Sequence, residues 1–240
     1  MARNTTSENH ISVIIPVYNE MAGINATIAH VLETAGDQAV EIIVADGGPE
    51  NATLAVLEDP AVVKVASRPG RGTQMNAGAA LASGRILLFL HADTRLPDGW
   101  STDVGQVLQQ DVRAGAFSLS IDSSRVALGV VALFANLRTR WERVPYGDQA
   151  HFFEARFFHE LGGYADIPIM EDVELFKRIR KQGDNILLLS KKVQTSPRRW
   201  ETEGVFRRTV ANWWLRIRYG FGASPAHLVA GYRPHGENRK

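Results

Sequence analysis

Short apolar runs alternate with helix-like patterns through the first part of the chain. Four runs rich in Ile, Val, Leu and Phe predict buried strands, at 11–15, 41–45, 62–66 and 85–90. Three stretches between them predict helices, at 20–35, 52–57 and 73–82. Strands that alternate with helices are typical of an α/β fold, in which helices flank a mostly parallel central sheet.

The pattern is less regular beyond residue 100. Helices are predicted at 101–110, 124–141, 171–182 and 204–221, with a shorter one inside 152–161. Strands are predicted at 114–121 and 185–189, and a turn at 145–149. The polar ends, 1–9 and 234–240, are expected to be disordered. We interpret the chain as a disordered N-terminus (1–9), one α/β domain (10–200) and a basic C-terminal helical extension (201–240).

Composition narrows the chemistry. The 240 residues contain no cysteine, which excludes a disulfide framework, a thiolate nucleophile and a zinc–thiolate site. Net charge is only +1, but residues 191–240 carry eleven Lys or Arg against three Asp or Glu, whereas the remainder carries 16 against 23. The acidic part suits a metal site, and the basic tail suits phosphates or an anionic membrane surface. No nucleic-acid partner is expected.

The basic helix predicted at 204–221 carries Trp213 and Trp214 on a broad apolar face, with arginines between. The interpretation we favour is that this face packs on the domain and the arginines face water. The alternative is peripheral contact with the anionic inner face of a membrane. Because the first ten residues lack an apolar signal segment and no apolar run approaches ~20 residues, a cytoplasmic protein is expected.

Polar loops follow the predicted parallel strands. In such sheets, ligands bind beyond the carboxyl ends of the strands. This rule places residues 16–20, 46–48, 68–72 and 91–93 along one edge. The sequence therefore predicts a ligand site at that edge.

Asp46 ends a predicted strand and precedes Gly47 and Gly48. Its carboxylate could accept hydrogen bonds from a base or ribose, with the glycines allowing close approach of the ligand. The alternative is that Asp46 only organises a turn, and for Asp46 considered alone this interpretation is the better one.

Arg68 and Arg71 lie in a glycine-rich loop just before a predicted helix, a pattern that suits an anion. The loop lacks the Gly-Lys-Ser/Thr ending of a P-loop, and a solvated basic loop is the competing interpretation. Gln74 and Asn76 add polar groups to the first turns of that helix.

His91, Ala92 and Asp93 follow the apolar run 85–90. A hard divalent cation that bridges two phosphates needs only one or two carboxylates and water, so Asp93 could hold such an ion. His91 could ligate the metal, contact the diphosphate or be structural.

Two further clusters allow both a structural and a functional interpretation. Glu171 and Asp172 begin a predicted helix, where acidic residues are common, yet either carboxylate could be a general base. Arg199 and Trp200 could clamp phosphates and cover a ligand, or form part of a basic surface.

These motifs occur together and in order along the chain. The stretches ISVIIPVYNE (11–20), EIIVADGG (41–48), NAGAALASG (76–84), LFLHADTRLP (88–97) and EDVELFKR (171–178) resemble a family 2 glycosyltransferase with the GT-A fold. GRGTQMNAG, PYGDQAHF and SPRRWETEG extend the resemblance to the arsenosugar-biosynthesis-type subgroup. The similarity covers roughly residues 11–232 and is specific for the fold rather than the substrate.

The resemblance implies roles for individual residues. Pro16, Tyr18 and Glu20 would line the nucleotide pocket, and Asp46 would bind the base or ribose. Asp93 matches the last Asp of the family's DxD motif, which holds Mg²⁺ or Mn²⁺, and Asp172 matches the catalytic base of inverting members.

Other positions follow from the same resemblance. Arg199 and Trp200 match the RW of a shortened QxxRW element on the nucleotide-sugar side. The acceptor side is expected to include Glu171 and the turn Gly147, Asp148 and Gln149.

The chain departs from the family pattern at several places. His91 replaces the first Asp of DxD, which leaves Mn²⁺ favourable because imidazole suits a softer metal. Gly47 and Pro49 replace the second Asp and the Ser of the DDGS turn. Thr195 or Ser196 stands for the Gln of QxxRW, so processive polymer synthesis is not expected.

The resemblance implies an inverting, metal-dependent glycosyltransferase of the hexosyltransferase type. It would move a sugar from a nucleotide-diphosphate sugar, with a UDP-sugar favoured, to the hydroxyl of an unknown acceptor. Two alternatives remain: a sugar-nucleotide nucleotidyltransferase and a non-catalytic nucleotide-sugar-binding module. The turn 16–20 lacks the glycine-rich basic signature of the first, and the retained Asp46, Asp93 and Asp172 disfavour the second.

Overall fold

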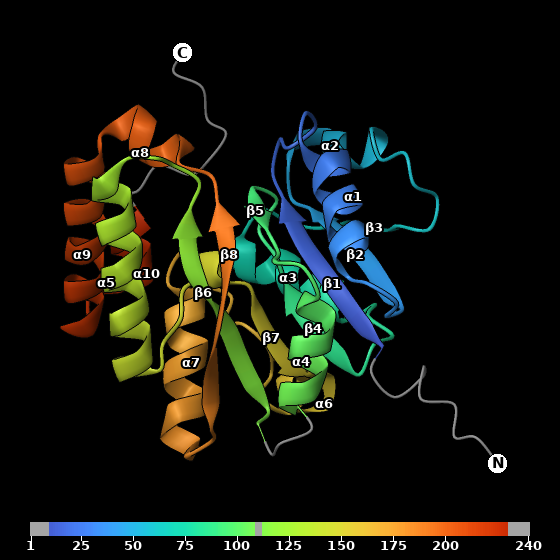
Figure 1. The fold of residues 1–240 in the computed structure, drawn as a ribbon. Coiled ribbons are helices and arrows are strands. Elements are labelled where there is room, and N and C mark those ends of the chain that lie inside the picture. The colour runs from blue at the N-terminus through green and yellow to red at the C-terminus, as the bar shows by residue number, and fades with distance from the viewer. Residues whose placement is uncertain (1–9, 109–111, 230–240) are drawn as a thin grey trace.

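The computed structural model of the chain describes residues 10–108 and 112–229 (Figure 1). The predicted disorder at 1–9 and 234–240 lies outside these residues, and so do the last two residues of the helix predicted at 101–110. The side chain of Arg199 is likewise outside the described part.

The described strands form one sheet in the order β3-β2-β1-β4-β7-β6-β8-β5. Their bounds are β1 (Ile11–Val17), β2 (Val40–Asp46), β3 (Val63–Ala66), β4 (Ile86–Phe89), β5 (Thr94–Arg95), β6 (Ala114–Ile121), β7 (His151–Glu154) and β8 (Ile186–Thr195). The first four pair in parallel, with β1 between β2 and β4. β7 runs antiparallel to β4 and β6, β6 and β8 are parallel, and β5 is antiparallel to β8. The predicted mostly parallel sheet is confirmed.

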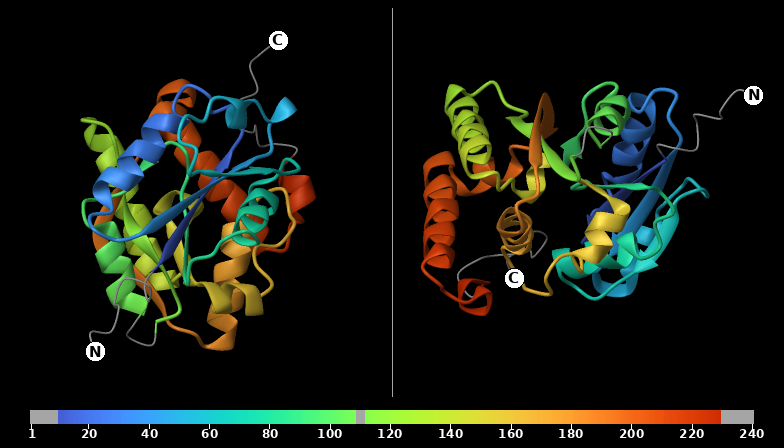
Figure 2. Two further views of the ribbon diagram at one scale, coloured as in Figure 1. Left: turned by 90° about the vertical axis from the view of Figure 1, so that its right-hand side faces the viewer. Right: turned by 90° about the horizontal axis from the view of Figure 1, so that it is seen from below.

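Helices cover both faces of this sheet (Figure 2). They are α1 (Ile24–Thr34), α2 (Ala52–Ala55), α3 (Arg71–Ala79), α4 (Trp100–Leu108), α5 (Val126–Glu142), α6 (Ala155–Glu160), α7 (Glu171–Gln182), α8 (Arg198–Glu203), α9 (Val205–Gly220) and α10 (Pro225–Val229). Two 3₁₀ turns add η1 (Pro49–Asn51) and η2 (Gly147–Gln149). Within these residues, no helix is both long and apolar enough to cross a bilayer.

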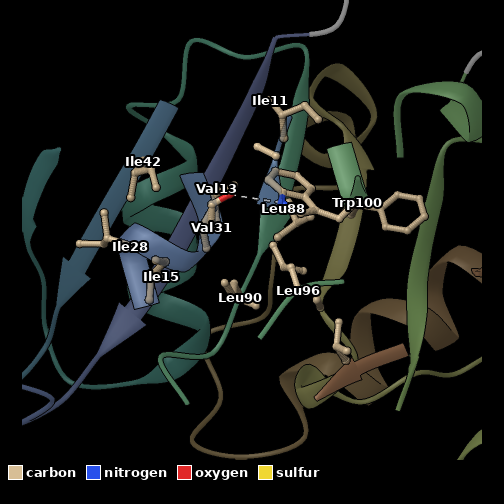
Figure 3. Packing of buried hydrophobic residues seen from close by; sticks show 14 of the residues in the cluster. Ile11, Val13, Ile15, Ile28, Val31, Ile42, Leu88, Leu90, Leu96 and Trp100 are labelled. Atoms are coloured by element: carbon tan, nitrogen blue, oxygen red, sulfur yellow. Dashed lines mark hydrogen bonds between the residues drawn. The ribbon is translucent and has the colours of Figure 1, made fainter. Parts of the chain in front are cut away.

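Alternation along β1 divides the core into two layers. Ile11, Val13 and Ile15 join the cluster under α1 and α4, whereas Ile14 joins the cluster under α3, α6 and α7. Trp100 fills the first layer and donates a hydrogen bond from Nε1 to the Val31 carbonyl at 3.3 Å (Figure 3). A strand buried on both faces reads as a continuous apolar run, which is why the parallel half was predictable.

The second half corrects several predictions. The short helix predicted inside 152–161 is present as α6, but strand β7, which directly precedes it, was not predicted. β7 lies between β4 and β6 and joins the two halves of the sheet. β8 extends to Thr195 rather than 189, since its later residues pair with both β6 and β5. β5, α8 and α10 were not predicted.

The long helix α9 lies beside α5 at one edge of the molecule (Figures 1 and 2). Val205, at the start of α9, packs with Leu128 and Ala132 of α5. Arg216, near the end of α9, forms an ion pair with Glu142, at the end of α5. The two helices therefore run in the same direction.

Candidate active site

The loops that follow β1, β2 and β4 meet along one edge of the sheet, as the strand order requires. The Gly47 N–H donates to the Val17 carbonyl at 3.1 Å, and the Leu90 N–H donates to the Ile14 carbonyl at 3.0 Å. The predicted juxtaposition of these loops therefore exists.

Asp46 is fully buried and organises its own turn. One carboxylate oxygen accepts the Gly48 N–H at 2.7 Å, and the other accepts the Thr53 N–H at 3.0 Å. A side chain with no exposed surface has no face to offer a base or ribose. In this structure, the interpretation of Asp46 as a turn residue is the better supported one.

Gln74 and Asn76 also serve the fold. Gln74 is buried and donates from Nε2 to the Val17 carbonyl at 2.6 Å and the Ala45 carbonyl at 2.9 Å, which ties β1 to β2. Asn76 donates to the Tyr164 carbonyl at 2.8 Å and accepts the Tyr164 N–H at 2.9 Å. The Gln74 side chain also fills the space above Gly47, where an added Cβ would lie 2.8 Å from Gln74 Cδ.

The two arginines of the basic loop differ in position. Arg68 is largely exposed and lies 3.4 Å from Asp166. Arg71 begins α3 and donates from Nε to Glu171 Oε1 at 2.5 Å, where Glu171 is almost fully buried. Glu171 therefore joins the start of α7 to the start of α3, and the structure does not expose it on an acceptor side.

Main-chain hydrogen bonds fix the position of the loop that carries Asp93. Its carbonyl accepts the Ser196 N–H at 3.1 Å, directly after β8 ends at Thr195. The neighbouring Ala92 carbonyl accepts the Thr27 hydroxyl at 2.7 Å. The loop that carries half-buried His91 and Asp93 is thus fixed to α1 and β8.

His91, Gly147 and Asp172 meet although they come from three separate parts of the chain. The Gly147 N–H donates to Asp172 Oδ2 at 2.8 Å, and the Val173 N–H donates to Oδ1 at 2.7 Å. A Cβ built on Gly147 would lie 2.7 Å from His91 Nε2 and 3.7 Å from Asp172 Oδ2. Because residue 147 is a glycine, η2 fits closely between His91, after β4, and Asp172, at the start of α7.

Asp148 lies within the electrostatic reach of the same group. Burial raises the pKa of its carboxyl to about 6, and the charges of Asp172 and Asp93 add to the rise, while Arg138 opposes it. Its Oδ1 is buried with no hydrogen-bond partner among the described residues. A desolvated carboxyl of this kind marks a place where a ligand could complete the interactions.

Gln149 does not face this space. Its Oε1 accepts the Thr139 hydroxyl at 2.9 Å and the Tyr146 N–H at 3.1 Å, and its Nε2 donates to the Phe117 carbonyl at 3.1 Å. It is buried and holds η2 against α5 and β6. The expectation that Gln149 lies on an open acceptor side does not fit this position.

The remaining predicted residues line the entrance or lie apart from it. Pro16 and Tyr18 are half-buried at the end of β1, and Glu20 Oε2 lies 3.9 Å from Arg198 of α8. Trp200 packs instead on the cluster at the start of α5. In this structure, the ring therefore lies against the end of β6 and α5.

The sequence did not indicate which residues hold the Tyr146 side chain, directly before η2. The Arg138 guanidinium lies 3.6 Å from the Tyr146 ring centroid, and Arg216 Nη1 donates to the Tyr146 hydroxyl at 2.9 Å. His151 is buried, and its Nδ1 lies 3.1 Å from the Tyr164 hydroxyl. The PYGDQ stretch, with an aromatic residue before a glycine and a carboxylate, was the available signal for Tyr146.

The described residues suit a metal ion that takes only some of its ligands from the protein. No three His, Cys, Asp or Glu side chains in this part of the chain gather as a metal cage. Asp93 and His91 are nevertheless both half-buried in the loop after β4, and His91 faces Gly147. One carboxylate and one imidazole fit an ion whose other ligands are phosphate oxygens and water.

Known proteins resemble this chain in sequence and in fold. A model of the family described as "Glycosyl transferase family 2" matches residues 12–151, more than half of the chain. The "Uncharacterized glycosyltransferase Rv1514c" of Mycobacterium tuberculosis (strain ATCC 25618 / H37Rv) is 29% identical over 184 residues, which cover 72% of this chain and 70% of that protein.

Two solved structures share the fold. The mannosyltransferase PcManGT from Pyrobaculum calidifontis, in complex with GDP-Man and Mn²⁺, matches with a TM-score of 0.65 at 18% identity, covering 90% of this chain and 66% of that chain. Glucosyl-3-phosphoglycerate synthase from Mycobacterium tuberculosis, in complex with Mn²⁺, UDP and phosphoglyceric acid, matches with a TM-score of 0.54 at 23% identity, covering 77% and 69%. The chain therefore spans about two thirds of the length of each, and what is shared is the GT-A fold.

Proposed function

Because this chain belongs to glycosyl transferase family 2, we propose that it transfers a sugar from a nucleotide-diphosphate sugar to an acceptor hydroxyl, with inversion at the anomeric carbon. The observation that carries the proposal is the meeting of His91, Gly147 and Asp172 beside Asp93. It combines a candidate base and a candidate diphosphate site on the fold of a sugar-nucleotide enzyme.

Asp172 is the proposed base. Its two backbone hydrogen bonds fix the plane of the carboxylate at the start of α7. In the proposed step, the acceptor oxygen attacks the anomeric carbon from the side opposite the diphosphate, and Asp172 takes the hydroxyl proton. The bond from the sugar to the diphosphate breaks in the same displacement, which inverts the anomeric centre.

The leaving diphosphate is the proposed ligand of the loop after β4. Asp93 and His91 would hold a Mn²⁺ or Mg²⁺ ion there, which when bound supplies charge neutralisation for the leaving group. Arg68 is exposed close to the start of α3 and is the proposed arginine contact to the phosphates. The solved neighbours carry a GDP-sugar in one case and UDP in the other, so a UDP-sugar remains a prediction.

The roles proposed for the other edge residues follow from position. Pro16, Tyr18 and the Gly47 backbone would border the nucleotide, while Asp46, Gln74 and Asn76 shape the pocket walls from within. On the acceptor side, Asp148 is the proposed contact, because its carboxyl is desolvated and within reach of Asp172. The arsenosugar-type subgroup, the sugar and the acceptor stay predictions, as does a cytoplasmic location.

A donor-hydrolysis assay tests the proposal. Purified full chain is incubated with UDP-, GDP- and dTDP-sugars in Mn²⁺, Mg²⁺ or EDTA, and release of nucleoside diphosphate is followed. We expect release from one donor class, with Mn²⁺ at least as effective as Mg²⁺ and no release in EDTA. Proton NMR of the product anomer then tests inversion.

Two results would overturn the proposal. Release of pyrophosphate from a sugar 1-phosphate and a nucleoside triphosphate, without donor hydrolysis, would indicate a nucleotidyltransferase. Tight donor binding with no turnover on any acceptor hydroxyl or water would indicate a binding module.

A further inference from the structure

The helices α5 and α9 expose apolar stripes of the same spacing. On α5, the exposed large apolar residues are Val126, Val130, Leu133, Phe134, Leu137 and Trp141. On α9 and the residue after it, they are Phe206, Val210, Trp213, Trp214, Ile217 and Phe221. Each set recurs at i, i+4, i+7, i+8, i+11 and i+15, which places it on one face of a helix. We call the two stripes together the α5/α9 face.

The arrangement reverses the expectation for α9. The apolar face was expected to pack on the domain, with the arginines in water. Instead, Arg208 is buried and pairs with Glu203, and Arg216 is half-buried between Tyr146 and Glu142. Phe206, Trp213 and Trp214 are exposed. Two of the four arginines of the helix are therefore anchored against the domain, while Phe206, Trp213 and Trp214 face outward.

The two stripes form one surface because the helices are neighbours and run in the same direction (Figures 1 and 2). Trp141 and Phe221, each 90% exposed, end the two stripes. Twelve exposed large apolar side chains on adjacent helices exceed the scattered single residues that are normal on a soluble surface. Such a face requires an explanation in terms of a partner.

The charges that flank the α5/α9 face are basic. Arg140 and Arg143 lie at the end of α5, and Arg207 and Arg218 lie beside the stripe of α9, all exposed. The sole acidic residue in the two helices is Glu142, and Arg216 pairs with it. A second copy of this chain would set arginines against arginines, so charge disfavours self-association through this face.

We infer that the α5/α9 face docks on an anionic lipid bilayer. An amphipathic helix with Trp, Phe and Leu on one side and Arg beside them lies in the membrane interface, with tryptophan at the headgroup level. Arginines at the rim contact the headgroup phosphates, each adding attraction to anionic lipid. Two parallel helices provide a planar contact that neither could provide alone.

The inward sides of α5 and α9 contact the residue that precedes η2. α5 ends at Glu142, and the chain then reaches Tyr146 and η2. Arg138 of α5 and Arg216 of α9 both hold the Tyr146 side chain. Tyr146 therefore links both helices of the docking face to η2; a role of this link in acceptor binding rests on the proposed function, whereas docking itself does not.

Vesicle co-sedimentation of the full chain tests the inference. We expect binding to vesicles of phosphatidylcholine with about a third phosphatidylglycerol, and about ten-fold weaker binding to phosphatidylcholine alone or in 0.5 M salt. Trp213→Gln/Trp214→Gln should weaken binding to anionic vesicles by about ten-fold or more. The matched control is Leu81→Gln, since Leu81 and Trp213 are each 54% exposed and Leu81 lies outside both helices. This control should bind like the unaltered chain.

A second variant separates docking from folding. Arg140→Gln/Arg218→Gln changes only exposed side chains and should weaken binding to anionic vesicles several-fold, with an unchanged melting temperature. Arg156→Gln, on α6, serves as its charge control and should have no effect.

Several results would overturn the inference, and none depends on catalysis. They are failure to bind anionic vesicles, equal binding by the Trp or Arg variants, and binding that ignores lipid charge. A dimer in sedimentation velocity that the double Trp variant abolishes, without vesicle binding, would assign the face to self-association.

Discussion

The polar side chains at the ends of the parallel strands differ from those around the start of α7. Asp46, Gln74 and Asn76 have their polar atoms engaged by backbone groups of neighbouring loops. Around α7, Asp148 Oδ1 is buried with no hydrogen-bond partner among the described residues, whereas buried Glu171 is bound through Oε1 to Arg71. Both sets are polar residues within motifs that resemble the family, so the sequence alone does not distinguish them.

The difference separates side chains that shape a pocket from side chains that await a ligand. A buried polar group with a complete set of hydrogen bonds contributes to stability and is costly to disturb. A desolvated carboxyl without a partner is costly to keep, and such groups concentrate at functional sites. We therefore expect substitutions in the first set to change folding. Substitution of Asp148, or of the proposed base Asp172, should change chemistry, although Asp172 also accepts two backbone N–H groups.

Asp172→Asn should have the largest effect. The amide keeps the shape of the carboxylate but cannot take up the proton of the acceptor hydroxyl, so turnover should fall by about 10²–10⁴-fold. Its NH₂ group must face one of the two backbone N–H donors, so some stability should also be lost. Donor affinity by calorimetry should stay within about two-fold. Glu174→Gln, on the same helix, is the control and should retain most activity. Turnover that survives in Asp172→Asn would remove the residue from the role of base.

Asp46→Ala should act on stability instead. It leaves the Gly48 and Thr53 N–H groups without their acceptor in a buried place, which should lower the free energy of unfolding in urea by about 2–4 kcal/mol. Donor affinity measured below the unfolding transition should change little. A stable variant that has lost donor affinity would contradict our comparison, because Asp46 would then belong to the ligand-binding set.

Asp93→Ala should weaken donor binding only when metal is present. Loss of a metal ligand should reduce Mn²⁺-dependent donor affinity by at least about 10–100-fold, the range seen even for groups that merely support metal ligands. Asp98→Asn, which changes an exposed aspartate between β5 and α4, should bind donor normally. Unchanged affinity of Asp93→Ala in Mn²⁺ would place the ion elsewhere.

His151 provides a pH-dependent test with a smaller effect. Burial lowers the pKa of its imidazole to about 3 from 6.5, so the folded protein keeps it neutral while the unfolded chain takes up a proton below pH 6.5. Stability from this site is complete above pH 6.5 and is lost as the pH falls towards 3. Between pH 7 and 5, the loss should be about 2 kcal/mol.

The matching variant is His151→Gln. It should be less stable at pH 7 but lose less stability between pH 7 and 5, as followed by urea unfolding at both values. An equal acid sensitivity in the two proteins would show that another group dominates.

The sequence predicted the parallel half well because its strands are buried on both faces and its loops must follow the strand ends. β7 was missed because HFFE runs directly into the helical ARFFHE, and only the position between β4 and β6 makes the first four residues extended. The prediction that the apolar face of α9 packs on the domain was wrong, because periodicity identifies an apolar face without showing what covers it.

The site was predictable in its parts but not in its contacts. The resemblance indicated Asp172 and Gly147, yet no spacing places a residue of η2 against the end of β4. Likewise, nothing local shows that Gln74 ties two strands together or that Gln149 is buried. These properties depend on tertiary neighbours, which a single sequence does not display.

The central position of β4 has a consequence for how the chain must be made. Until β7 is available, β4 has β1 on one side only and is an edge strand of four buried apolar residues. An unpaired apolar edge invites pairing with other chains. The family match ends at residue 151, where β7 begins. A fragment cut at that boundary, or a nascent chain stalled there, would therefore aggregate rather than fold as a small nucleotide-binding unit.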